Sequence, residues 1–182
     1  MGDIVARSTQ PTLGAAKLAW WRDRLEQLDH APPPAAPALR AASEHLLPLG
    51  VKGADLATLE DGWATLLDEE VDAERVAGRG ARLFRLGAQI LGREEDMIGD
   101  AGELYALVSV GRRGVPQLIV EAKAPARRLA GYRFPRALRP LSALARLAVR
   151  DLDQREAFES EGSPPRLAAI MRHRWSGVVT RG

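Results

Sequence analysis

Apolar residues recur along most of the chain at intervals of three and four, the spacing that places side chains on one face of an α-helix. Near the start, Leu18, Trp21, Leu25 and Leu28 follow this spacing and predict a helix over about residues 13–28. Runs of β-branched residues, which favour strands, are scarce. The pattern therefore predicts an all-α helical bundle. Its further helices are expected at 38–47, 54–68, 72–91, 95–111, after residue 116 with a break at residue 125, at 137–151 and at 165–178.

Polar and proline-rich segments separate these helices. Residues 31–37 contain four prolines and are expected to form a linker, because proline cannot continue a helix. Residues 153–163 are polar and are expected to form a loop, and residues 1–11 are expected to be flexible. A chain of 182 residues is long enough for one hydrophobic core, so we expect a single domain over 1–182.

The predicted helix at 72–91 contains three glycines, Gly78, Gly80 and Gly87. Each costs an exposed helix interior roughly 1 kcal/mol relative to alanine. Close approach of a neighbouring helix would compensate for this cost, so we predict a tight helix–helix contact. Asp68 and Asp72 come just before this helix, where acids are favoured by its dipole, and we interpret them as capping residues.

Composition and charge narrow the functional classes. The chain has no cysteine, which excludes disulfides and thiolate chemistry, and it has no apolar run near the ~20 residues that cross a bilayer. Its start lacks the apolar core of a secretory signal, so we expect a cytoplasmic location, with membrane-peripheral contact as the alternative. Residues 126–182 contain twelve Arg and no Lys against five acids, or +7, while residues 1–125 contain 14 bases against 19 acids, or −5. Such a basic segment can attract anionic lipid, nucleic acid or a diphosphate, although a solvated arginine face explains the same count.

The tryptophans and histidines have structural interpretations. Trp20 and Trp21 are about 100° apart on a helix, so one is expected in the core and the other partly exposed. His45 is expected on a helix surface, and His173 stands among arginines that lower its proton affinity. Trp175 shares a stripe with three apolar residues, which fits either a core face, the interpretation we favour, or a helix lying on an anionic membrane. Those three residues are Leu167, Ile170 and Met171.

Two segments carry a resemblance to a known family. The chain reads LAWWRDRL at 18–25 and AGRGARLFRL at 77–86, with PTLG at 11–14, DGW at 61–63 and QILG at 89–92 in the same order. Downstream, LRPL at 138–141, AR at 145–146, RD at 150–151 and RHR at 172–174 are similar to the closing segments of bacterial members. Together these segments resemble the squalene/phytoene synthase family, the head-to-head trans-isoprenyl diphosphate synthases.

The resemblance implies an isoprenoid synthase fold that is shortened at its N-terminus, because family members carry a further helical segment before the tryptophan pair. It also implies two aspartate-rich Mg²⁺ sites, and this sequence lacks both at the matching positions. Only Asp3 is acidic among the residues before the match, and Arg113 and Gln117 stand where the second pair of acids belongs. Since an arginine repels Mg²⁺, we expect no catalytic residues and a pseudoenzyme.

If a lipid cavity persists, the resemblance places six residues around its polar end. Asp96 and Asp100 are weak candidates for a metal site, since they open a helix and no second facing pair is visible. The cavity candidates are Arg22, Arg79, Arg82, Arg85, Tyr105 and Arg112.

Three functions remain open. The first is a non-catalytic homologue that binds an isoprenoid or lipid, or that assists assembly like the respiratory complex I assembly factor of this fold. The second is a prenyltransferase of squalene, carotenoid or hopanoid (terpenoid) biosynthesis that uses Mg²⁺, with its missing aspartate pair upstream of Met1 or on a partner subunit. The third is a basic helical adaptor for an anionic membrane or nucleic acid, of which nucleic acid is the less favoured. We favour the first, without a cofactor, and expect a protein partner or a homodimer to cover apolar surface.

Overall fold

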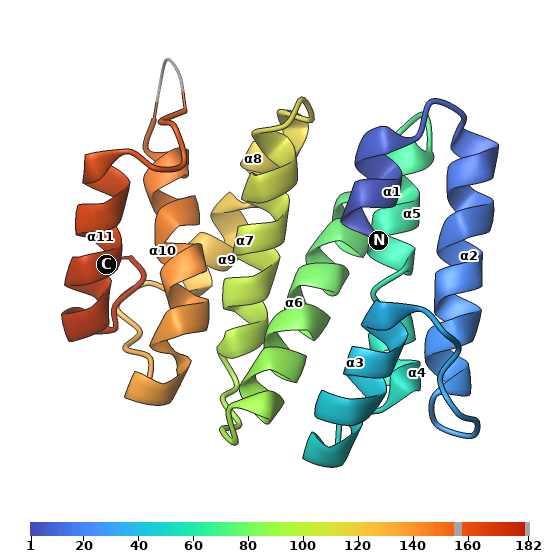
Figure 1. Cartoon of the computed structure of the whole chain (residues 1–182). Helices are drawn as coiled ribbons and strands as arrows, with labels where there is room; N and C mark the ends of the chain where they lie inside the picture. Colours follow the sequence, from blue (N-terminus) through green and yellow to red (C-terminus); the bar gives the residue numbers. More distant parts are fainter. Residues whose placement is uncertain (155–157, 181–182) are drawn as a thin grey trace.

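The computed structural model describes residues 1–154 and 158–180, and within these ranges the chain is all-α (Figure 1). β pairing in the described ranges is limited to two isolated bridges, Ala130 with Thr180 and Arg133 with Val178. The α-helices are α1 (Gly2–Arg7), α2 (Pro11–Gln27), α3 (Pro37–His45), α4 (Gly53–Ala57), α5 (Asp61–Ala64), α6 (Ala73–Ile90), α7 (Ile98–Gly111), α8 (Gln117–Glu121), α9 (Lys123–Arg128), α10 (Arg139–Leu152) and α11 (Pro164–Ser176). Short 3₁₀ turns are η1 (Leu47–Leu49), η2 (Thr65–Leu67) and η3 (Arg136–Leu138).

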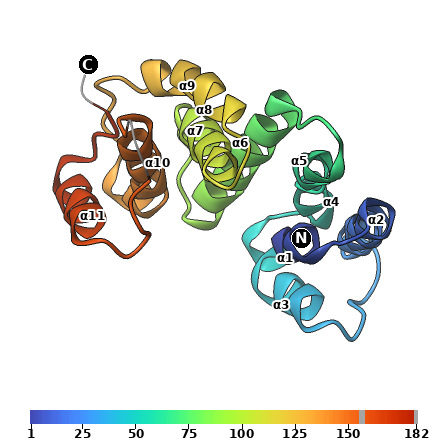
Figure 2. The same cartoon turned by 90° about the horizontal axis from the view of Figure 1, so that it is seen from above.

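The long helices stand side by side and form an arc. Seen from above, the arc runs from α11 through α10, α7 and α6 to α4, α5 and α2, and α8 and α9 lie along its convex side (Figure 2). α7 runs along the middle of this arc, with α6 on one side and α10 on the other (Figure 1). Helix α7 therefore borders the spaces on both of its sides, toward α6 and toward α10 (Figure 1).

Two separate hydrophobic clusters support the arc. The larger one is built from α6, α7, α10 and the segments around them, and it includes Phe84, Leu104 and Phe134. The smaller one joins α2, α3 and α4 and includes Leu25 and Leu39. Trp21 packs partly buried against the smaller cluster, whereas Trp20 is 43% exposed, so the tryptophan pair divides into one packed and one exposed ring.

The tight contact predicted for the glycine-bearing helix is present between α6 and α7. A methyl group built on Gly80 would lie 2.1 Å from the carbonyl oxygen of Gly102 on α7, so only glycine allows this approach. Gly87 faces Leu141 at 3.0 Å, whereas Gly78 has only the Arg82 guanidinium nearby, at 3.5 Å. The prediction is thus confirmed for Gly80 most strongly and not for Gly78.

The start of α6 confirms the capping interpretation for Asp72 but not for Asp68. The Asp72 carboxylate accepts hydrogen bonds from the backbone N–H groups of Glu74 and Arg75. The Asp68 carboxylate accepts a 3.1 Å hydrogen bond from the Arg75 guanidinium, which ties the loop before α6 to its first turns.

The single helix predicted at 54–68 is wrong: α4, α5 and η2 divide this stretch into short pieces. The Asp29 carboxylate accepts hydrogen bonds from the N–H groups of Gly53 and Ala54, which fixes the start of α4 from a distant part of the chain. These bonds lower the pKa of Asp29. Gly62 lies against the Arg75 carbonyl oxygen, so α5 is held by contact with α6 rather than by continuing α4.

Other boundaries differ by a few residues. The segment 1–11 contains α1, where Gly2 packs against the Trp63 ring, instead of being irregular throughout. The break expected at Pro125 lies at Ala122, between α8 and α9. Of the predicted loop at 153–163, residues 155–157 lie outside the described residues.

Candidate functional site

A pocket of about 380 Å³ lies between α7 and α10, and Glu161 from the segment before α11 and Arg166 from α11 complete its lining. We refer to it as the α7–α10 pocket. Polar and apolar side chains divide its wall into two parts. The polar residues are Tyr105, Ser109, Arg112, Arg113, Glu161 and Arg166, and the apolar residues are Val108, Leu144, Leu147 and Ala148.

A buried carboxylate organises the polar part of the wall. Asp151 is 3% exposed and receives Arg112 on one oxygen, at 2.5 Å, and Arg166 on the other. Arg112 also donates a 2.7 Å hydrogen bond to the Glu159 carbonyl oxygen. The two guanidinium groups are therefore fixed in place by one shared acid, which joins α7, α10 and α11.

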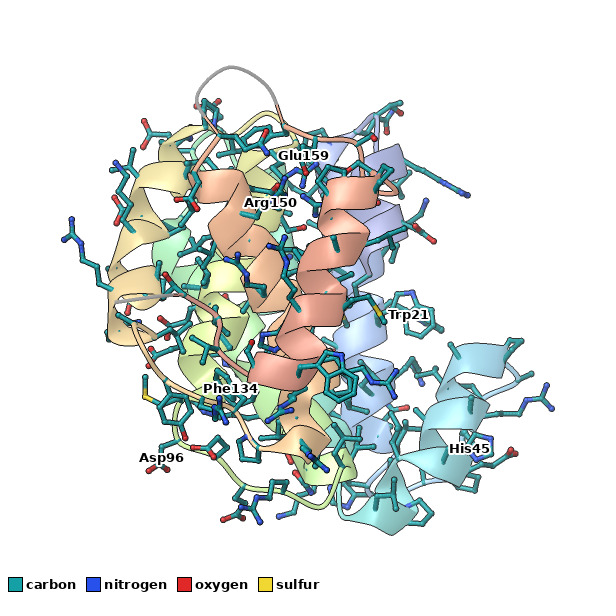
Figure 3. All side chains as sticks on the ribbon, turned by 90° about the vertical axis from the view of Figure 1, so that its left-hand side faces the viewer. Trp21, His45, Asp96, Phe134, Arg150 and Glu159 are labelled. Carbon is teal, nitrogen blue, oxygen red and sulfur yellow. The ribbon has the colours of Figure 1, made fainter. Side chains whose placement is uncertain are left out.

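A second ion pair stabilises the same end of the molecule. Arg150 donates two hydrogen bonds to the Glu159 carboxylate, and this pairing lowers the pKa of Glu159 to about 2. Figure 3 shows Arg150 and Glu159 together at one end of the molecule, with Asp96 at the other end. The segment before α11 is thus held over the pocket by charged contacts.

The polar part of the wall carries a net positive charge. Arg112, Arg113 and Arg166 face two acids, Asp151 and Glu161, which leaves one positive charge. Arg166 is 6% exposed and its Nε has no hydrogen-bond partner. A buried donor without an acceptor costs about 1–3 kcal/mol. Arg113 is exposed, and it makes no ion pair within the described ranges.

A further arginine lies buried near this pocket. Arg79 of α6 is 6% exposed, donates a 3.1 Å hydrogen bond to the Gly62 carbonyl oxygen and stacks 3.8 Å from the centre of the Trp63 ring. It pairs with no carboxylate among the described residues. Burial lowers the pKa of Arg79 to about 10, and the nearby Arg113 acts in the same direction while Tyr105 opposes it. The field behind Tyr105 is therefore positive.

The apolar part of the wall comes from α10. Leu144 is 37% exposed and Leu147 is half-buried, so both present apolar surface to the pocket. Across from them, Tyr105 packs 5.6 Å from the Phe84 ring, which fixes its position on the larger core. The pocket consequently has a cationic end and an apolar side, and its volume lies within the range typical of small-molecule sites.

Two of the six cavity candidates line a different cavity, of about 720 Å³, which opens beside α6 and the α6–α7 loop. Arg82 and Arg85 lie there, and Arg82 donates a 2.7 Å hydrogen bond to the Thr58 carbonyl oxygen. The acids outnumber the arginines in its lining by four to three, so this cavity does not favour an anion. The four acids are Asp55, Glu94, Glu95 and Asp96.

The remaining candidates are spread over the molecule. Arg22 is exposed on α2 and pairs with its neighbour Asp23 at 3.1 Å. Arg79 is buried behind Trp63, so only Tyr105 and Arg112 line the α7–α10 pocket. The single cavity framed by all six residues is therefore not what the fold builds.

The metal candidates do not form a metal-binding group. The Asp100 carboxylate accepts a 2.7 Å hydrogen bond from Arg128, while Asp96 faces the other cavity. Across the described residues, no three His, Asp or Glu side chains are grouped to hold an ion. At the position expected for the second acid pair, the cationic Arg113 lines the pocket, and this donor set does not fit Mg²⁺.

The sequence reasoning missed Arg166 and Asp151 as parts of a site. The Arg–Asp dipeptide at 150–151 was the available signal, but nothing in the spacing indicated that Arg112, 39 residues away, reaches Asp151. Comparison of the chain with protein-family models, curated proteins and solved structures found no match. The α7–α10 pocket is therefore the main indication of what this chain does.

Proposed function

We propose that this chain is a metal-independent binding protein for an anionic amphiphile, such as an isoprenoid diphosphate, and that it does not act as a synthase. One observation supports this most strongly: the α7–α10 pocket joins an arginine end, built on Asp151, to the apolar wall of α10. The resemblance to squalene/phytoene synthases agrees with this ligand class, because those enzymes bind isoprenoid diphosphates.

The arginine end suits the diphosphate head. Arginine binds phosphate oxygens through two parallel N–H groups, and Arg113 is free of ion pairs within the described ranges. Because Asp151 holds Arg112 and Arg166 in advance, little side-chain entropy is lost when an anion binds.

The apolar wall suits the hydrocarbon tail. Leu144 and Leu147 offer surface that a bound chain would remove from water, at roughly 25 cal/mol per Å² buried. A ligand with only the head or only the tail would use half of the wall. The proposal therefore requires farnesyl diphosphate to bind more tightly than either inorganic diphosphate or farnesol.

The same arginines argue against the synthase reaction. Loss of diphosphate from an allylic substrate needs Mg²⁺ to neutralise the leaving group, and a cation at position 113 opposes binding of that ion. Guanidinium groups supply charge for binding, and the described residues contain no group of three His, Asp or Glu side chains that could hold a metal ion beside them. Binding, rather than condensation, is the role that the pocket favours.

Calorimetric titration with farnesyl diphosphate in EDTA tests this proposal. We expect binding without Mg²⁺, and Arg113→Ala should weaken it by about tenfold to a hundredfold, as for loss of a charged hydrogen bond. Arg40→Ala is the matched control, because Arg40 is an exposed arginine on α3, a helix that packs in the smaller cluster through Leu39 and does not line the pocket. Absence of binding, or equal weakening by both substitutions, would refute the proposal that farnesyl diphosphate binds in the α7–α10 pocket. Binding that requires Mg²⁺ and releases diphosphate would identify a prenyltransferase instead.

A further inference from the structure

The outer face of α11 carries large apolar side chains that the fold leaves uncovered. Leu167, Met171 and Trp175 are spaced four residues apart and are 55%, 55% and 78% exposed. We call these three residues the α11 face. The core role favoured from the sequence is wrong for them, since Ala169 and His173 supply the buried side of this helix instead.

Arginines surround the α11 face. A groove of about 580 Å³ runs between α11 and the start of α10, with Trp175 at its edge and no acid in its lining. Helix α11 itself contains no Asp or Glu over Pro164–Ser176. The arginines are Arg136, Arg139 and Arg174 in the groove and Arg172 on the exposed surface of α11.

The end of α11 is held rigidly against α10. Arg139 donates hydrogen bonds to the carbonyl oxygens of Arg174 and Trp175, at 2.7 and 3.2 Å, so it satisfies acceptors that a helix end leaves open. Gly177 then turns the chain with a φ of +70°, a conformation that favours glycine. The position of Trp175 is therefore set by the fold.

This combination of charge and apolarity matches a membrane surface. An amphipathic helix with arginines beside Trp and Leu lies in the interfacial plane, where cations meet lipid phosphates and the apolar face enters the acyl boundary. Tryptophan suits that boundary because its ring is apolar and its N–H remains wet. None of the described helices is long and apolar enough to cross a bilayer, so the contact would be peripheral.

We propose that the α11 face docks the protein on anionic lipid bilayers. Leu167, Met171 and Trp175 enter the headgroup region, while Arg136 and Arg174 contact lipid phosphates. This surface is separate from the α7–α10 pocket: α11 contributes to that pocket only through the buried Arg166, and the pocket and the groove beside Trp175 share no lining residue. Membrane docking can therefore fail while the pocket binds its ligand, and the reverse is also true.

Vesicle flotation tests the surface with two lipid compositions. We expect binding to phosphatidylcholine vesicles containing phosphatidylglycerol and far weaker binding to phosphatidylcholine alone. Removing both charges with Arg136→Ser and Arg174→Ser should weaken binding roughly thirtyfold, from about 1 kcal/mol per arginine near an anionic surface. Met171→Gln with Trp175→Gln should weaken it by about tenfold or more, through lost insertion.

Val120→Gln is the matched control, because Val120 is 60% exposed on α8, away from α11. It should leave vesicle binding unchanged. Equal binding to both lipid compositions would overturn the proposal, as would insensitivity to the α11 substitutions. Two further outcomes would replace it: salt-sensitive binding of an oligonucleotide with no vesicle binding, or a dimer by light scattering that Trp175→Gln dissociates and that does not float.

Discussion

Helix α6 offers a stability test with its own control, because its glycines face different surroundings. A methyl group on Gly80 would lie 2.1 Å from the Gly102 carbonyl oxygen and 2.6 Å from the Ala106 Cβ, both on α7. On Gly78, two residues earlier, the nearest atom is a terminal nitrogen of Arg82 at 3.5 Å. Gly80→Ala must therefore push two core helices apart, whereas Gly78→Ala fits without rearrangement.

The magnitude follows from these distances. Moving the Gly102 oxygen out to an ordinary contact of 3.4 Å requires a shift of about 1.3 Å between α6 and α7. Overpacking of this kind typically costs 1–3 kcal/mol, and a backbone contact in the main core belongs at the upper end, so we expect a loss of about 3 kcal/mol for Gly80→Ala. Gly78→Ala should instead raise the free energy of unfolding by about 0.5–1 kcal/mol, through helix propensity and a less flexible unfolded chain.

Urea denaturation followed by far-UV circular dichroism measures both effects. Gly87→Ala gives an intermediate point, because its new methyl group would meet only the flexible end of Leu141, at 3.0 Å, and we expect a loss of stability of less than about 1 kcal/mol. The expected order of stability is Gly78→Ala, wild type, Gly87→Ala, Gly80→Ala. A Gly80→Ala protein as stable as the Gly78→Ala protein would refute the close approach of α6 and α7.

Two further stability predictions concern buried polar groups. Asp151→Asn should lower the free energy of unfolding by about 3–5 kcal/mol in urea titrations, because Arg112 and Arg166 lose their shared carboxylate. A loss below about 1 kcal/mol would contradict the two buried ion pairs of Asp151. Burial lowers the pKa of His173, whose ring is hydrogen-bonded to Ser142 and to the Val178 carbonyl oxygen. The neutral ring therefore stabilises the fold above the unfolded-state pKa of 6.5, and this stability is lost as the pH falls through the lower folded-state pKa. His173→Gln should reduce the decrease in urea midpoint between about pH 7 and 5. An unchanged dependence of the midpoint on pH would count against this role of His173.

The long helices could be predicted because their signals are local. Helix α6 combines the apolar spacing with Asp72 at its start, and its glycines indicated a close neighbour before that neighbour was known. The stretch 54–68 has the same apolar spacing, yet it is divided by contacts from elsewhere in the chain. Asp29 fixes the start of α4, and Gly62 is pressed against α6. Periodicity cannot report such contacts, because they depend on the tertiary arrangement.

The pocket and the α11 face show the same limit. Leu167, Met171 and Trp175 have the spacing of a core stripe, and their exposure follows only from which side of α11 meets α10. Asp151 is recognisable as an acid beside an arginine, but its two partners are 15 and 39 residues away. The sequence therefore supplied the basic character of this region, and the fold decides which arginines are free to bind an anion.

Helix α7 connects stability with the proposed ligand. Its Gly102 backbone lies directly against the Gly80 backbone of α6, while its Tyr105 and Ser109 line the pocket. A ligand that binds only the folded chain adds about 2.7 kcal/mol at 100 times its Kd, close to the loss expected for Gly80→Ala. Farnesyl diphosphate in EDTA should therefore restore most of the unfolding midpoint of Gly80→Ala.

The same ligand should restore much less in Asp151→Asn, because that substitution releases the arginines that hold the diphosphate. Thermal unfolding of both variants with and without ligand separates these cases. Equal recovery of the unfolding midpoint in the two variants would place the ligand away from Asp151, since a site that does not depend on the ion pairs of Asp151 stabilises both proteins alike. Recovery confined to Gly80→Ala links the bound anion to the buried carboxylate that organises the α7–α10 pocket.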